Sequence, residues 1–577
     1  MHDMVDSLHA PHISMPRLLS TGLCTLALLA LALPGRSQTV PTPSRTSATS
    51  ADCEIGSVRT TLSSLSVSAY LSNAGMLFWP GIGPSRYTVN GATTMYNLSL
   101  WLGGDVDGQL RFSGAPYTVG EFWPGPLDES GATDAARCAA YDRIWVVKAE
   151  DLESYRTSGI ASPDVREWPI GYGAPFFVDA NDNAKLDPGV EALIELTPAD
   201  PGYGTRTIDL AAGERPAVLS AAGTRSAEGR VAFWILNDVG NEHVWSGQQG
   251  LGVEVHVSAY ALTSPSFAVQ DATFYRHTVV NRSPKPITDF RLSFFADPDI
   301  GASSDDYVAS DPDRGMLVGY NANESASYAV GLDLLTGASG AIPFDVNAVT
   351  GDRLSAVQNA QRNRWIDGTP ITRGGDGYNP GQTDVTSWIY DGDPVTSGFW
   401  TEENIDGSGS SQTPGERVVV LNTPSTTLGP GETTTVDLAI LYGFGGSAGR
   451  MGGIQGVRFG SDTIQNAYDF GGLAALQDGP FTVATEPESS LDRSALEVHP
   501  SPVRGGSRVP FTLPSPGPVR LRVMDVLGRE VMTLAEGVYG VGPHDVWFDA
   551  SSLPAGVYVL VLDTDGQRVA RTVTVAR

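Results

Sequence analysis

The chain has 577 residues, a formal net charge of −28 and a pI near 4.5. This acid excess argues against a nucleic-acid-binding function, which needs a basic surface. It leaves three explanations open: solubility of a secreted protein, a saline habitat, or a supply of carboxylates for divalent cations. Gly and Pro contribute 66 and 39 residues, and long amphipathic helical patterns are scarce. That composition is typical of a mainly β protein.

The N-terminus has the layout of a secretory signal peptide over residues 1–37. Its apolar run is Leu18–Leu33, and small residues at the third and first positions before the cut, Gly35 and Ser37, predict cleavage after Ser37. Met15 is an alternative start, because two aspartates lie within the first six residues, where a signal peptide is normally basic. Residues 38–52 are rich in Ser, Thr and Pro, which predicts a linker. No second apolar run is long enough for a membrane span, so we expect no transmembrane segment in the mature chain.

Two cysteines, Cys53 and Cys138, remain after the predicted cleavage. In an oxidising compartment a disulfide between them is plausible. Two unpaired thiols are the alternative, since spacing alone cannot bring two Cα atoms within about 7 Å.

The body is expected to be a large β-sandwich-like unit with loop insertions. We divide it into a loop-rich β region, 53–267, and a sandwich-like region, 268–483, which form one or two domains. Strands are predicted at Asn97–Leu102, Arg143–Lys148, Val231–Leu236, Val253–Leu262, Thr273–Asn281, Phe290–Ala296, Met316–Tyr320, Ala329–Leu334, Val418–Asn422 and Thr434–Tyr442. Short helices are predicted at Ala149–Arg156, Ser355–Arg364 and Asp462–Tyr468.

One loop of the body carries a calcium-binding pattern. Oxygen-bearing side chains occupy positions 1, 3, 5 and 9 of an EF-hand-like loop, and a backbone carbonyl occupies position 7. These residues are Asp179, Asn181, Asn183, Asp187 and, for the carbonyl, Lys185. The pattern departs from an EF-hand where Ala184 replaces the glycine of position 6 and where Glu191 stands one place after position 12. The alternative is a surface turn held by its own side-chain to backbone hydrogen bonds.

A second acidic segment follows the predicted strand Phe290–Ala296. Its weaker calcium candidates are Asp297, Asp299, Asp305 and Asp306, and the run continues to Asp311 and Asp313. If the segment folds back, these carboxylates converge and repel one another unless a cation or Arg314 neutralises them. Solvated loop acids are the alternative.

Motifs for catalysis are weak in this sequence. It contains no His-Glu-x-x-His and no Cys-x-x-Cys. A Gly-x-Ser-x-Gly match at Gly445–Gly449 lacks a later histidine in the body to act as the base. Paired carboxylates of a glycoside hydrolase cannot be excluded, because their separation is not written in a sequence. The body's ten tryptophans could stack on sugars, although we assign most of them to the core.

The last 84 residues, 494–577, follow a linker at 484–493 and form a separate module. Alternating patterns and frequent glycines predict about seven short strands and hence a small Ig-like sandwich. The segments Val523–Val531 and Phe548–Tyr558, with the His499–Pro502 entry, resemble the C-terminal sorting domain of bacterial type IX secretion cargo. A related resemblance is to the Ig-like domain of flagellar-hook-capping proteins. The resemblance implies export through the general secretory pathway, the periplasm and the type IX machinery to the cell surface or medium.

Blocks in the body resemble those of large uncharacterised secreted proteins that carry the same kind of tail. They are Leu100–Gly104, Phe122–Leu127, Tyr141–Trp145, Asp297–Gly301, Asp305–Val308 and Arg364–Pro370. We therefore expect an exported surface or extracellular protein with a binding or adhesive, non-enzymatic role. The alternative is a secreted hydrolase acting on polysaccharide through paired carboxylates, which requires an acid-lined cleft.

Overall fold

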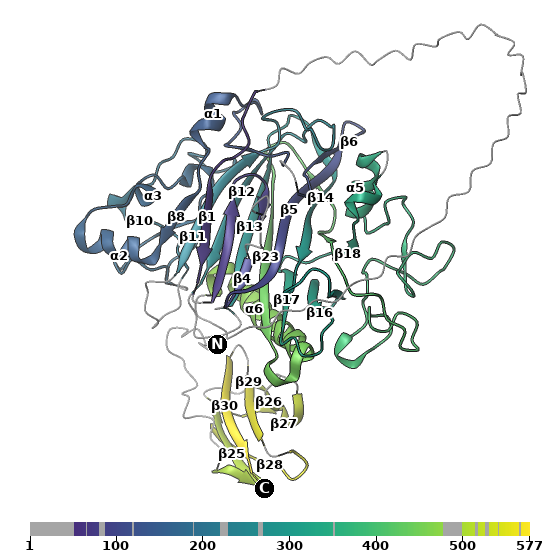
Figure 1. The fold of residues 1–577 in the computed structure, drawn as a ribbon. Coiled ribbons are helices and arrows are strands. Elements are labelled where there is room, and N and C mark those ends of the chain that lie inside the picture. Colours follow the sequence, from purple (N-terminus) through teal and green to yellow (C-terminus); the bar gives the residue numbers. More distant parts are fainter. Residues whose placement is uncertain are drawn as a thin grey trace, which may run out of the picture. The chain divides into compact units, whose positions relative to one another are not determined.

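The fold was analysed in a computed structural model of the chain (Figure 1). It describes residues 51–64, 66–79, 87–117, 120–187, 190–219, 229–262, 269, 271–349, 352–476, 499–513, 517–525, 530–540, 542–554, 556–564 and 567–576. The predicted signal peptide, nearly all of the 38–52 linker and the 484–493 linker lie outside the described residues.

The first sheet of the body is antiparallel and has the order β1-β2-β4-β5-β14-β21-β18, with β3, β6 and β22 paired beside this path. Its strands are β1 (Arg59–Ser63), β2 (Val67–Ser72), β3 (Met76–Leu77), β4 (Tyr87–Val89), β5 (Ala92–Val106), β6 (Gln109–Ser113), β14 (Ile287–Pro298), β18 (Gly340–Pro343), β21 (Val419–Asn422) and β22 (Thr426–Leu428). The long central pair, β5 and β14, joins residues almost two hundred positions apart, for example Leu100 to Phe294.

The second sheet is also antiparallel and has the order β15-β16-β17-β23-β13-β12-β11-β7, with β8 paired to β11. Its strands are β7 (Trp123–Pro124), β8 (Trp145–Lys148), β11 (Arg230–Asn237), β12 (Val253–Ala261), β13 (Thr273–Asn281), β15 (Asp306–Asp311), β16 (Met316–Asn321), β17 (Tyr328–Leu334) and β23 (Thr433–Phe444). Two small hairpins add β9 (Phe176–Val178) with β10 (Glu214–Pro216), and β19 (Ile371–Thr372) with β20 (Val385–Thr386).

The two sheets pack face to face around one apolar core (Figure 1). Side chains alternate along each strand with a period of two. On β12, Val255 and Val257 therefore face this core, whereas Tyr260 points to the opposite side. Direct contacts cross the interface, such as the hydrogen bond of 2.9 Å between the hydroxyls of Tyr87 and Thr273. The mainly β, sandwich-like body predicted from the sequence is confirmed.

Helices cover the outer face of the second sheet and enclose a second apolar cluster. The helices of the body are α1 (Ala135–Ala140), α2 (Ala149–Ser158), α3 (Pro163–Arg166), α5 (Arg353–Gln361) and α6 (Gly449–Ala475), with 3-10 turns η1 (Ile170–Tyr172), η2 (Leu210–Ala212), η3 (Val346–Ala348), η4 (Pro394–Thr396) and η5 (Gly446–Ala448). Helix α6 lies across β17 and β23, while α2 and α3 lie beside β8 and α5 lies beside β14 and β21 (Figure 1).

The body is one sandwich rather than two, because both predicted regions supply strands to both sheets. Region 53–267 gives β5 to the first sheet and β11 to the second, and region 268–483 gives β14 and β23. The provisional boundary near residues 265–270 therefore falls within one unit.

The C-terminal module has seven strands in the order β27-β26-β29-β30-β24-β25-β28. They are β24 (His499–Arg504), β25 (Gly506–Leu513), β26 (Gly517–Asp525), β27 (Glu530–Tyr539), β28 (Gly542–Asp549), β29 (Gly556–Thr564) and β30 (Gln567–Val575). Its first and last strands pair in parallel, Val503 with Val575, and its buried side chains form a core of their own. The small seven-stranded sandwich agrees with the predicted fold class. Residues 526–529, within the Val523–Val531 segment of the resemblance, lie outside the described residues.

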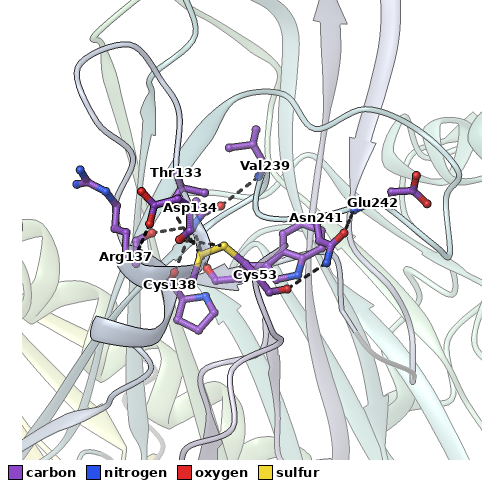
Figure 2. Close-up of a disulfide and its surroundings, with 12 residues drawn as sticks. Cys53, Thr133, Asp134, Arg137, Cys138, Val239, Asn241 and Glu242 are labelled. Atoms are coloured by element: carbon purple, nitrogen blue, oxygen red, sulfur yellow. Dashed lines mark hydrogen bonds between the residues drawn. A yellow bond between two sulfur atoms is a disulfide. The ribbon is translucent and has the colours of Figure 1, made fainter. Parts of the chain in front are cut away.

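A disulfide joins Cys53 to Cys138 on α1, with the two Cα atoms 5.7 Å apart (Figure 2). The amide of Asn241 donates to the Cys53 carbonyl at 3.2 Å, and the Cys53 amide donates to the Gly240 carbonyl at 3.0 Å. Asp134 caps α1 by accepting from the Arg137 amide at 2.8 Å. The bridge thereby connects the first described segment of the body to α1, near β7 at the edge of the second sheet.

Candidate functional site

The predicted calcium loop directly follows β9 and wraps around the carboxylate of Asp179, which is 8% exposed. Its two oxygens accept from the backbone amides of Asn183 at 3.1 Å and Ala184 at 3.0 Å. Ala184 takes a φ of +60°, the left-handed conformation for which an EF-hand uses glycine at this position. The backbone therefore makes the sharp turn despite the side chain.

The remaining predicted ligands of this loop also point inward. The side-chain amides of Asn181 and Asn183 both donate to one oxygen of Asp187, each at 2.7 Å. Rotating either side-chain amide by about 180° would place its oxygen, instead of its nitrogen, beside that Asp187 oxygen. Glu191 closes the loop by accepting from the amides of Ala180 and Asp187 at 2.7 and 3.1 Å. The late glutamate, rather than the residue at position 12, is thus the one that faces the loop.

A positive charge already lies beside this loop. The guanidinium of Arg215 is buried, and its Nε lies 3.8 Å from a carboxylate oxygen of Asp179. The same guanidinium packs over the ring of Tyr155 at 4.9 Å. Arg215 therefore partly neutralises Asp179, and the loop also bonds its own polar atoms.

The second acidic segment lies where the chain crosses from one sheet to the other. Strand β14 of the first sheet ends with Asp297 and Pro298, and β15 of the second sheet begins at Asp306. Asp297 is 2% exposed and Asp306 is 1% exposed, whereas Asp299 and Asp305 are half-buried. Two of the four predicted aspartates therefore lie in the interior, and the other two lie at its edge beside the exposed residues 301–304.

Three buried carboxylate oxygens in this cluster lack a hydrogen bond. The hydroxyl of Tyr117 donates to one oxygen of Asp297 at 2.8 Å, and the amide of Ile300 donates to one oxygen of Asp306 at 3.2 Å. The buried Oδ1 atoms of Asp297, Asp299 and Asp306 have no hydrogen-bond partner. Leaving such an atom unpaired costs about 1–3 kcal/mol, more when the group is charged. Asp305 differs, since it accepts from the Asn321 amide at 2.7 Å.

The sequence did not reveal one member of the cluster, Glu416. This exposed residue lies in the segment before β21, which pairs with β14 in the first sheet. Burial, and next the charge of Glu416, raise the pKa of Asp297 well above its usual range and that of Asp299 to about 6. Burial also raises the pKa of Asp306 to about 8, against the lowering effect of the Ile300 amide. These carboxyl groups are therefore close enough to oppose one another's ionisation.

Arg314 does not neutralise this cluster. It pairs with Asp311 at 3.0 Å and with Asp462 of α6 at 2.8 Å, and Arg458 of α6 also binds Asp311 at 2.9 Å. Asp313 is exposed. The acidic run predicted as one segment thus divides into two groups. The acids at 297–306 form no ion pair with Arg314, whereas Asp311 is ion-paired with arginines beside and on α6.

The three histidines of the body are packed residues. His243 bonds the Glu121 carboxylate at 3.2 Å and the Asp238 carbonyl at 2.8 Å. His256 bonds the carboxylate of Glu254 at 3.0 Å, and both residues lie on β12. Burial lowers the pKa of His277 to about 4, so this ring is neutral at physiological pH. Their buried positions fit structural roles.

Two cavities in the body differ in place and in lining. A void of about 10 Å³ lies between the sheets, next to His277 and Phe294. A groove of about 430 Å³ lies at the surface along Thr197 and the segment 426–434, and Glu432 is the one carboxylate among its lining residues. Neither of these two cavities therefore holds the pair of carboxylates that glycoside hydrolysis needs. Six of the ten body tryptophans are buried and the other four are half-buried.

Within the described residues, no three or more His, Cys, Asp or Glu side chains are already placed to hold a metal ion. None of the helices in this part of the chain is both long and apolar enough to cross a membrane. No family model matches the chain, and no curated protein matches it.

A search of solved structures finds similarity to a protein described as a polysaccharide lyase. The sequence identity is 9% and the TM-score is 0.18, over 75% of this chain and 42% of that one. This chain thus spans less than half the length of that structure. At this TM-score the similarity carries no argument about activity.

Proposed function

We propose that this protein is exported to the cell surface or the medium, where its body binds an extracellular ligand without catalysis. The C-terminal module acts as the sorting domain that the type IX secretion machinery recognises. The resemblance of residues 494–577 supports the export route, and the geometry of the body supports the binding role.

The observation that carries the binding role is the closed body. Both faces of its second sheet are buried in apolar clusters, and six of the body's ten tryptophans are buried. The open groove is lined mainly by threonines, with Glu432 as the single acid among its lining residues. The polysaccharide hydrolase alternative requires two carboxylates about 5–10 Å apart in a cleft, and neither cavity supplies them. Loops on a rigid β scaffold are the usual location of binding surfaces.

Two features support the export route. The module from β24 to β30 has its own sheet and its own core, as a transferable sorting domain requires. The disulfide between Cys53 and Cys138 is a kind of bond that persists in oxidising compartments such as the periplasm.

The route is tested by expression in a bacterium that possesses type IX secretion, with fractionation into periplasm, cell surface and medium. Deletion of residues 494–577 leaves a folded body in the periplasm, whereas the complete chain reaches the surface or medium. A point variant refines the test: Leu521→Asp places a charge in the module's core, where Leu521 is 0% exposed, and is retained like the deletion. Ser552→Asp, at an exposed position of the same module, is the matched control and is exported. Surface delivery of the truncated chain would contradict the proposal.

A further inference from the structure

We propose that the void between the two sheets is a binding site for one water molecule, held by the indole of Trp234 and the imidazole of His277. The water supplies the hydrogen bonds that the Nε1 atom of Trp234 and the Nδ1 atom of His277 do not find within the protein. This inference concerns the core of the body and depends neither on the binding role nor on the export route.

The strand register explains why a void forms at this point. Trp234 of β11 is paired with Val257 of β12, and Val257 is paired with His277 of β13. The three side chains therefore stand in one row on the inner face of the second sheet. Neighbouring strands are about 4.8 Å apart, so the strands that carry the two rings are roughly 10 Å apart. Only the short side chain of Val257 stands between the rings, and the space above it stays unfilled. Gly75, which faces the void from the other side, has no side chain to fill it.

Most of the wall of this void is apolar. The apolar lining residues on both sheets are buried, and besides Val257 they are Leu77, Leu98, Leu100, Leu236 and Phe294. The ring of Phe294 meets that of His277 edge to face, with 5.1 Å between the centroids. These walls supply no hydrogen bond, so the polar atoms of the lining need a partner that enters the void.

Two polar atoms of the lining residues are unpaired. Trp234 is 1% exposed and His277 is 3% exposed. Among the residues that the structure describes, neither the Nε1 atom of Trp234 nor the Nδ1 atom of His277 has a hydrogen-bond partner. A buried donor or acceptor left unpaired loses its hydration without compensation, so folded proteins satisfy such atoms with protein groups or ordered water. A third polar group is the Ser72 hydroxyl, which accepts from the Ala74 amide at 3.2 Å and keeps its own proton to donate.

The size of the void selects water. Its volume of about 10 Å³ is at the lower end of the range, about 10–15 Å³, that admits a single water molecule, and it leaves no room for a larger guest. Buried waters make about three hydrogen bonds, and Trp234, His277 and Ser72 offer that number. Burial lowers the pKa of His277 to about 4, so the ring is neutral. Because water both donates and accepts, it satisfies the Nδ1 atom in either neutral tautomer. The bound water connects β2 of the first sheet to β11 and β13 of the second.

The test fills the void in the full chain by Val257→Ile, which adds one carbon between the two rings. The added group displaces the water and leaves both nitrogens unpaired, so we expect the melting temperature of the body to fall by about 2–5 °C. The same change is then made in a Trp234→Phe, His277→Leu background, which has neither nitrogen. There it only fills apolar space, and the melting temperature is expected to stay unchanged or to rise by about 1–3 °C.

A matched control and a direct observation complete the test. Val255→Ile changes a buried valine on the same face of β12 that does not line the void, and it is expected to shift the melting temperature equally in the two chains. A high-resolution crystal structure of the wild-type chain is expected to show one ordered water within about 3.2 Å of Trp234 Nε1 and of His277 Nδ1.

Three results would count against the water site. A melting temperature that Val257→Ile raises in both chains would show that the void is dry and gains from being filled. An equal fall in both chains would assign the loss to overpacking instead of a displaced water, and would overturn the proposal as well. Well-defined density for both rings with no water between them would refute it directly.

Discussion

At the scale of single residues, the body buries several acids, and Asp333 is a clear example apart from Asp297 and Asp306. It lies on β17 and is 0% exposed. The hydroxyl of Ser461 on α6 donates to one of its oxygens at 2.6 Å, while the other oxygen has no hydrogen-bond partner. Burial raises its pKa to about 7; Asp311 and Asp462 add to the rise and Arg314 opposes it.

This shift gives a pH dependence with a defined sign. The folded-state pKa lies above the unfolded value of about 4. The contribution of Asp333 to the free energy of unfolding is therefore fully present below pH 4 and is lost as the pH rises toward 7. Asp333→Asn removes this loss of stability at high pH. We expect the free energy of unfolding of the variant, relative to that of the wild type, to be about 1–3 kcal/mol higher at pH 8 than at pH 4.5, measured by thermal unfolding at both pH values. An equal difference between the two proteins at both pH values would refute the argument.

The same residue scale shows where sequence reasoning ends. The spacing of Asp179, Asn181, Asn183 and Asp187 is local, so the inward-facing loop was predictable from the pattern. The aspartates at 297–306 were also visible as a run. Glu416 was not, because only the pairing of β14 with β21 brings it near them, and a single sequence does not state which distant strands pair.

At the scale of elements, the strands were the predictable part and α6 was not. Its helical pattern was recognised only over Asp462–Tyr468, although the helix runs from Gly449 to Ala475. Glycines weaken helix propensity, so the first three turns of the helix were not recognised. These glycines are required there by packing: a Cβ on Gly453 would lie 2.9 Å from the backbone nitrogen of Ala329 on β17, and a Cβ on Gly456 would lie 3.0 Å from the Cα of Gly443 on β23. Tertiary contact therefore overrides local propensity.

That close approach can be tested with one methyl group. Gly443→Ala forces α6 away from the sheet, because both obstructing atoms, the Gly453 oxygen and the Val457 nitrogen at 2.4 Å, belong to backbone. We expect a loss of about 3 kcal/mol in the free energy of unfolding, measured by denaturant titration. Gly398→Ala is the matched control, since its added Cβ meets nothing closer than 3.4 Å. A loss below about 0.5 kcal/mol for Gly443→Ala would mean that the helix position is adjustable.

At the scale of the whole molecule, the described chain comprises two units of unequal complexity. The body buries two clusters on the two faces of its second sheet, with strands that alternate between sheets along the chain. The C-terminal module buries one small core between neighbouring strands. Composition and alternation were enough to predict the module and the fold class. They could not predict one body instead of two, because interleaving of strands is a long-range property.

Separate cores predict separate unfolding, and the disulfide makes the two transitions distinguishable. Cys53 and Cys138 are 85 positions apart in the body, and the module from residue 499 contains no cysteine. Scanning calorimetry of the mature chain is expected to show two transitions, and a chain ending at residue 476 should lose one of them. Cys53→Ser removes the bridge and lowers the stability of the body by about 2–4 kcal/mol, because the unfolded chain regains the entropy of an open loop. The transition of the module is expected to stay in place, so that a shift of both transitions together would show that body and module unfold as one cooperative unit.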